Sequence, residues 1–99
     1  MTTLPTLKSS FTQLIGSPSI SALEAQHDMS NKAVIALLHN WFTDLGMSCQ
    51  AHSVANTRDK HNFVASYGSG QGGLLLAGHT DTVPFDEGRW SQDPFQLVE

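Results

Sequence analysis

The chain contains very little cysteine, few basic residues and no long apolar run. Cys49 is the only cysteine among 99 residues, which excludes an internal disulfide and agrees with a reducing compartment. Five Lys and Arg against nine Asp and Glu give a formal net charge of -4, so we expect no nucleic-acid partner. No stretch approaches membrane-spanning length, and the first ten residues lack a basic cluster followed by an apolar stretch. We therefore expect a cytoplasmic protein with no signal peptide and no membrane partner.

The most informative segment of the sequence ends in a histidine and a carboxylate. Residues 74–78 are apolar or small and lead directly into His79, with Asp81 two residues further on and Pro84 closing the segment. A neutral imidazole binds zinc readily, and a carboxylate on its other ring nitrogen fixes the tautomer. The pattern predicts that His79 is a metal ligand and that Asp81 is the catalytic-site residue that orients it. The competing interpretation is an ordinary surface pair, because His-x-Asp alone is a weak pattern.

Apolar periodicity predicts the secondary structure around this segment. Helices are expected at residues 4–15 and 30–45, where apolar side chains recur every three or four positions and a glycine follows. Strands are expected at 47–54, 63–67 and 74–78, and the glycine-rich residues 68–73 predict that the last two form a β-hairpin. Residues 74–76 are three consecutive leucines, which indicates a central strand covered on both faces. The expected fold is α/β, a layered α/β/α arrangement with a mostly parallel mixed sheet.

The glycine-rich residues 68–73 also satisfy the Gly-x-Gly-x-x-Gly spacing of dinucleotide-binding loops, through Gly68, Gly70 and Gly73. Phosphate binding by that motif requires the glycines to open a helix. Here they lead into the predicted strand before His79, so no cofactor-binding residue is assigned to them.

The pattern formed by His79, Asp81 and Pro84 is similar to the first metal-binding motif of the zinc-dependent aminoacylase and carboxypeptidase-G-type metallopeptidases. The resemblance extends over nearly the whole chain, including residues 14–21, 57–63 and 72–95, and is strongest toward members that deacetylate N2-acetyl-L-ornithine. It implies that His79 is a zinc ligand and that Asp81 supports it without binding the metal. It also implies two zinc ions in the whole enzyme, which cobalt could replace.

The same resemblance sets the expected function. Residues 1–99 would be the amino-terminal part of the catalytic domain, with the other ligands, the general base and a dimerisation domain lying further along. The whole enzyme would be a homodimer in arginine biosynthesis that hydrolyses N2-acetyl-L-ornithine to L-ornithine and acetate, and the fragment alone would be inactive. Two alternatives stay open: a sibling amidohydrolase, such as succinyl-diaminopimelate desuccinylase or an aminopeptidase, and a non-catalytic α/β interaction module that needs no metal.

Overall fold

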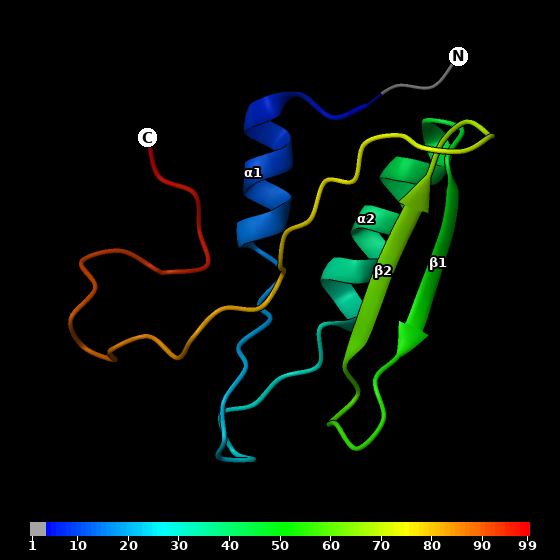
Figure 1. Ribbon diagram of the computed structural model, residues 1–99. Coiled ribbons are helices and arrows are strands. Elements are labelled where there is room, and N and C mark those ends of the chain that lie inside the picture. Colours follow the sequence, from blue (N-terminus) through cyan, green and yellow to red (C-terminus); the bar gives the residue numbers. More distant parts are fainter. Residues whose placement is uncertain (1–3) are drawn as a thin grey trace.

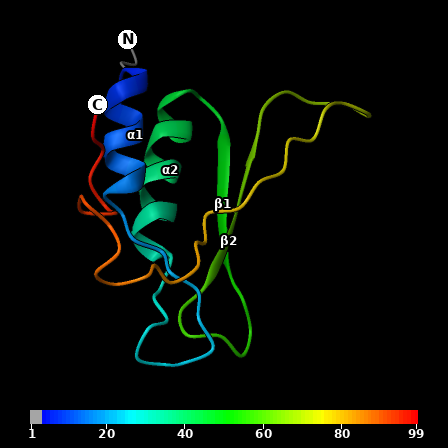
Figure 2. The same ribbon diagram turned by 90° about the vertical axis from the view of Figure 1, so that its left-hand side faces the viewer.

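The computed structural model describes residues 4–99. Its regular elements are the helices α1 (Leu7–Ile15) and α2 (Lys32–Asp44) and the strands β1 (Ser48–Ser53) and β2 (His61–Ser66) (Figure 1). The two strands form an antiparallel sheet in which Ser48 is opposite Ser66 and Ser53 is opposite His61. Helix α2 packs against this hairpin, and α1 lies on the other side of α2 (Figure 2). The described chain is therefore a small α/β unit.

Helix α1 begins later than the periodicity predicted. The Thr6 side chain accepts a hydrogen bond from the Ser9 backbone N–H at 3.1 Å, so Thr6 is the N-cap and Pro5 lies before it. This cap supplies a partner for one of the amides that a helix start leaves unpaired. Gly16 follows the last helical residue, as predicted.

Helix α2 confirms the helix expected over residues 30–45. Val34 and Ile35 on this helix are buried, and the helix packs against both strands of the hairpin. The N-cap residue, Asn31, makes no side-chain bond to its own helix. Its amide instead accepts from the His61 N–H and donates to the His61 carbonyl, both at 2.8 Å. Asn31 thus joins the start of α2 to the start of β2.

The predicted hairpin partner is wrong. Residues 63–67 overlap β2, but β2 pairs with β1 rather than with residues 74–78. The seven residues between the two strands include Asn56 and Asp59 at positive φ, a conformation that these two residue types tolerate. A turn there brings β1 and β2 together before the glycine-rich residues 68–73 are reached.

The central, doubly covered strand predicted at residues 74–78 is absent from the described structure. This segment runs extended without a strand partner, and Leu74, Leu75 and Leu76 are 83–87% exposed. A layered, mostly parallel sheet requires neighbouring strands and helices on both faces. Residues 4–99 supply two antiparallel strands with a helix on one face, so that part of the expected fold is not seen.

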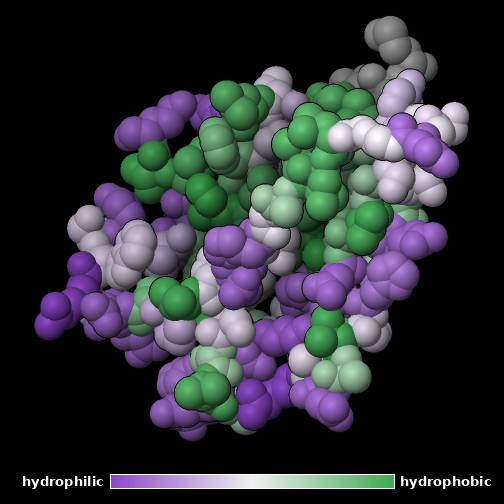
Figure 3. Space-filling view, viewed as in Figure 1, coloured by the Kyte–Doolittle hydropathy of each residue, from purple (hydrophilic) through white to green (hydrophobic). Residues whose placement is uncertain are grey.

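The buried core is small for the length of the chain. The buried apolar residues among those described are Ile20, Val34 and Ile35. The chain exposes 7840 Å², whereas a compact protein of its 10.7 kDa mass would expose about 5,500 Å². Its radius of gyration is 15.6 Å, against about 13 Å for a compact domain of this size. Apolar side chains accordingly reach the surface over the upper part of the face seen in Figure 3. Neither α1 nor α2 is long and apolar enough to cross a membrane.

Candidate functional site

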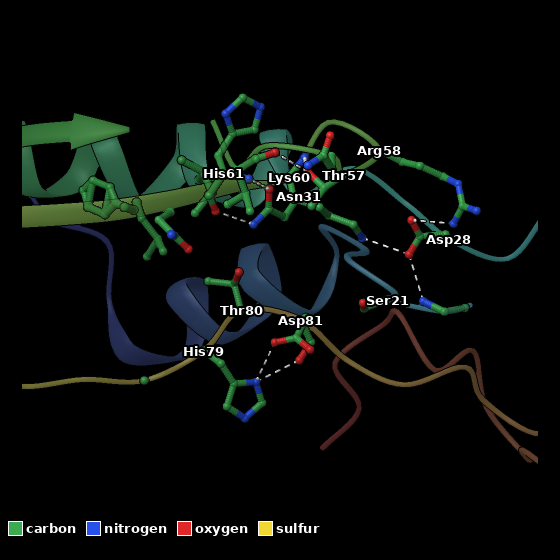
Figure 4. Close-up of a pocket in the computed structure, with 18 of the residues that line it drawn as sticks. Ser21, Asp28, Asn31, Thr57, Arg58, Lys60, His61, His79, Thr80 and Asp81 are labelled. Atoms are coloured by element: carbon green, nitrogen blue, oxygen red, sulfur yellow. Dashed lines mark hydrogen bonds and ion pairs between the residues drawn. The ribbon is translucent and has the colours of Figure 1, made fainter. Parts of the chain in front are cut away.

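The two predicted site residues contact each other directly. His79 Nδ1 lies 2.9 Å from the Asp81 backbone oxygen and 3.2 Å from Asp81 Oδ1. Their side chains lie on the same side of an extended segment, and Thr80 between them points to the opposite side, toward Asn31 (Figure 4). The two-residue spacing produces this arrangement, because alternate side chains of extended backbone project to the same side.

The contacts of His79 determine which ring nitrogen is available. Both partners of Nδ1 are oxygen acceptors, so a neutral imidazole in this position carries its proton on Nδ1 and donates it to Asp81. Nε2 then keeps its lone pair. The His79 side chain is 79% exposed, and no hydrogen bond to Nε2 is made by the described residues. Nε2 is therefore open to an incoming ligand, and the donor chemistry fits a zinc ion.

His79 and Asp81 do not complete a metal site by themselves. Within residues 4–99 there is no group of three or more His, Cys, Asp or Glu side chains that could hold a metal ion. Structural zinc sites need four protein ligands, and catalytic sites usually need three. The pair supplies one candidate ligand and the group that orients it.

The segment carrying His79 and Asp81 is held by the residues that connect α1 to α2. Ile20 forms an isolated parallel bridge with Thr82. The Ser21 N–H donates to the Thr82 carbonyl at 2.8 Å, the Thr82 N–H donates to the Ser19 carbonyl at 3.2 Å, and the Ser19 hydroxyl donates to the Thr80 carbonyl. This contact was not anticipated from the sequence. The available signal was Ile20 between two serines, a polar–apolar–polar alternation typical of paired extended backbone.

A cleft of about 1130 Å³ separates residues 78–81 from the beginning of α2, from β2 and from the turn before it. The view in Figure 4 looks into this cleft, with Asn31, Lys60 and His61 on the wall opposite Thr80. The His79 ring points away from that wall. The cleft therefore lies beside the candidate ligand.

One carboxylate organises the charged wall of this cleft. Asp28 has only 4% of its side chain exposed, and it accepts hydrogen bonds from the Ala22 N–H at 2.8 Å, Lys60 Nζ at 3.0 Å and Arg58 Nη1 at 3.3 Å. The Ala22 amide bond, followed by the Lys60 bond, holds the pKa of Asp28 below its ordinary value. These bonds favour the charged carboxylate. Asp28 thereby ties the loop after Ile20 to the turn between the strands, a role that the sequence did not suggest.

A second carboxylate is stabilised nearby. Asp59 accepts a bond from the Ser30 hydroxyl at 2.8 Å and contacts His61 Nε2 at 2.8 Å. The Ser30 bond first, and His61 second, lower the pKa of Asp59. His61 lies two residues before the strand expected at 63–67, but it begins β2 and has 18% of its side chain exposed. Its contacts are explained by the hairpin and by Asp59.

The chain is similar in sequence to several proteins named acetylornithine deacetylase. The chain is 59% identical over 96 residues to an acetylornithine deacetylase of Proteus mirabilis, covering 97% of this chain and 25% of that protein. It is 56% identical over 96 residues to an acetylornithine deacetylase of Salmonella arizonae, with the same two coverages. It is 50% identical over 99 residues to that of Pasteurella multocida, covering 100% of this chain and 26% of the relative. No family model matches the chain. The chain spans about a quarter of the length of the curated relatives it matches.

Proposed function

We propose that this chain, which is similar to acetylornithine deacetylases along almost its entire length, is part of a metal-dependent hydrolase of that kind. The expected reaction of the whole protein is hydrolysis of N2-acetyl-L-ornithine to L-ornithine and acetate. Identities of 50–59% to proteins named for this activity favour it over the sibling activities, desuccinylation of diaminopimelate and aminopeptidase cleavage. The whole protein is proposed to act as a cytoplasmic homodimer.

The observation that carries the proposal is the contact of His79 Nδ1 with two oxygens of Asp81. It assigns the proton to Nδ1 and leaves the Nε2 lone pair directed outward, as a zinc-binding imidazole requires. His79 would hold the metal through Nε2, and Asp81 would keep the ring in the correct tautomer and orientation. When bound, zinc supplies Lewis-acid polarisation of the scissile carbonyl. Cobalt could take its place, because nitrogen and oxygen donors discriminate poorly among first-row divalent ions.

The proposal requires more ligands than the described residues bring together. No group of three candidate ligands occurs within residues 4–99, and two metal ions need several carboxylate or imidazole donors. We place the remaining ligands and the general base in the part of the protein that corresponds to the other three quarters of its relatives. The 99-residue chain alone is expected to bind zinc weakly and to be inactive.

The experiment that tests this function is segment replacement. The matching 96 residues of the Proteus mirabilis enzyme are exchanged for those of this chain, and deacetylation of N2-acetyl-L-ornithine and zinc content are measured. The chimaera is expected to be active, and His79→Ala is expected to remove activity and lower zinc content. Asp81→Ala should weaken zinc binding by about 10- to 100-fold, as is typical when a ligand loses its orienting partner.

His52→Ala provides the matched control, because His52 is an exposed histidine on β1 that contacts Gln50. It should leave activity and zinc content unchanged. A folded chimaera in which His79→Ala retains full zinc content and activity would show that His79 is not a ligand. A folded chimaera with wild-type His79 that lacks both activity and bound zinc would favour the non-catalytic interaction module.

A further inference from the structure

We propose that Ser19 is a positioning residue for the His79–Asp81 pair, an inference that rests on the function proposed above. Ser19 is 61 residues away from Thr80 in sequence, yet its side-chain hydroxyl donates a hydrogen bond to the Thr80 carbonyl. That carbonyl belongs to the peptide group joining Thr80 to Asp81. The hydroxyl therefore fixes the one peptide plane that decides where Asp81 stands relative to the His79 ring.

The Ser19 hydroxyl acts from a rigid position. Ser19 is 5% exposed and its neighbour Ile20 is also 5% exposed, so both are anchored in the small core. The Ser19 backbone carbonyl accepts from the Thr82 N–H at 3.2 Å. Ser19 thus contacts the segment at two points that flank Asp81, one through its side chain and one through its backbone.

The segment has little else to hold it. Residues 68–79 make no backbone hydrogen bond to the rest of the described chain, and the leucines just before His79 are exposed. The first anchor that the chain meets after the glycine-rich residues is the Thr80 carbonyl. If this carbonyl loses its partner, the Thr80–Asp81 peptide can rotate, and His79 Nδ1 can then move away from the two Asp81 oxygens. The peptide that follows Asp81 stays bonded to the Ser19 carbonyl through the Thr82 N–H. The two backbone bonds at Thr82 hold the segment after Asp81, and the Ser19 hydroxyl holds the peptide between His79 and Asp81.

Loss of that order has a specific spectroscopic consequence. A neutral histidine in water favours the proton on Nε2, whereas donation to Asp81 requires it on Nδ1. The tautomer of His79 consequently reports whether the Asp81 oxygens are in place. A residue that only stabilised the fold would change the melting temperature without changing this tautomer in the folded chain.

The test uses the metal-free 99-residue chain with 15N-labelled histidine, at a pH where His79 is neutral. Long-range proton–nitrogen correlation spectra distinguish the two tautomers, and His79→Ala identifies the His79 signals. We expect the Nδ1–H tautomer to predominate in the wild-type chain. Ser19→Ala should lose that signature and return His79 to the Nε2–H tautomer, while Ser19→Thr, which keeps a hydroxyl, should retain it.

Ser21→Ala is the matched control. It makes the same chemical change two residues away, but Ser21 is exposed and binds Thr82 through its backbone N–H. The wild-type tautomer should therefore survive in this variant. If Ser19→Ala does not fold, Ser19→Cys takes its place, because the thiol is similar in size and is a much weaker donor. The same loss of the Nδ1–H signature is expected.

The outcomes separate the two proposals. A wild-type chain with the Nε2–H tautomer would overturn the orientation of His79 by Asp81, and with it both the function argument and this inference. A wild-type chain with the Nδ1–H tautomer that persists in folded Ser19→Ala or Ser19→Cys would overturn the role of Ser19 alone. Loss of the signature in Ser21→Ala as well would also reject a specific role for the Ser19 hydroxyl.

Discussion

Replacing Asn31 with alanine should destabilise the described chain strongly. The Asn31 side chain both donates to the His61 carbonyl and accepts from the His61 N–H, each at 2.8 Å. It is 9% exposed, and it is the contact through which the start of α2 binds the first residue of β2. The Asn31 amide thus binds the backbone N–H and carbonyl of His61 as a residue of a neighbouring strand would.

The expected magnitude follows from the two backbone groups that the substitution leaves without a partner. A buried donor or acceptor that loses its partner costs about 1–3 kcal/mol. Water can reach part of this edge, since Asn62 beside it is exposed, so we take the lower half of that range for each group. Asn31→Ala should then lower the free energy of unfolding by about 2–4 kcal/mol, or the melting temperature by about 10–30 °C for a domain of this size.

Urea and thermal unfolding followed by circular dichroism measure these differences. Asn40→Ala is the matched control, because Asn40 is an exposed asparagine on the same helix and its loss should change stability by no more than about 0.5 kcal/mol. The reasoning would be refuted by an Asn31→Ala chain as stable as the control.

Three further predictions concern charge, backbone space and burial. Hydrogen bonds from a backbone amide and a lysine hold the pKa of Asp28 below its ordinary value in the folded chain, so its contribution to stability is present above about pH 4 and is lost as the pH falls through the folded-state pKa. Asp28→Asn should therefore reduce the fall in melting temperature that the chain shows below about pH 4. An unchanged fall in melting temperature would contradict the assignment. Gly16→Ala would place a Cβ 2.9 Å from the Thr12 carbonyl oxygen and should lower the free energy of unfolding in urea by about 1–3 kcal/mol. Gly78→Ala is the control, because its Cβ meets no described atom within 4 Å. Equal stability of the two variants would disprove the clash. Leu75 is 87% exposed, so Leu75→Ala should change the free energy of unfolding by under about 0.5 kcal/mol. Ile35 is 6% exposed, so Ile35→Ala should lower that free energy by about 2–4 kcal/mol. Similar losses in the two variants would mean that residues 74–78 are buried.

Local patterns in the sequence predicted the elements whose structure is decided locally. The three- and four-residue spacing of apolar side chains located α2 to within two residues at its start, because one face of that helix packs on the hairpin. The alternation over residues 47–54 located β1. Strand pairing was predicted wrongly, because pairing is a contact between separate segments and the three consecutive leucines carry no alternation that selects a partner. Asn56 and Asp59, both at positive φ, were the local signal for the turn that does form.

The candidate site also has one part that local sequence predicts and one part that depends on distant contacts. The contact between His79 and Asp81 follows from a spacing of two in extended backbone, so the sequence alone could predict it. Nothing near Ser19 in the sequence points to Thr80, because that hydrogen bond depends on how the α1–α2 connection meets a segment 61 residues later. The local sequence thus predicts which residues form the candidate site, whereas the contacts that hold those residues in place depend on the tertiary structure.

The segment whose function the sequence predicts most clearly, residues 74–84, is also poorly packed in the structure. The segment with His79 is joined to the core through one hydroxyl bond and two backbone bonds around Ile20 and Thr82. Three such bonds contribute about 2–4 kcal/mol in total, far less than a strand buried in a layered sheet would gain from its apolar side chains. In the described chain the orientation of His79 therefore rests on hydrogen bonds from the α1–α2 connection rather than on burial of the leucines that precede it.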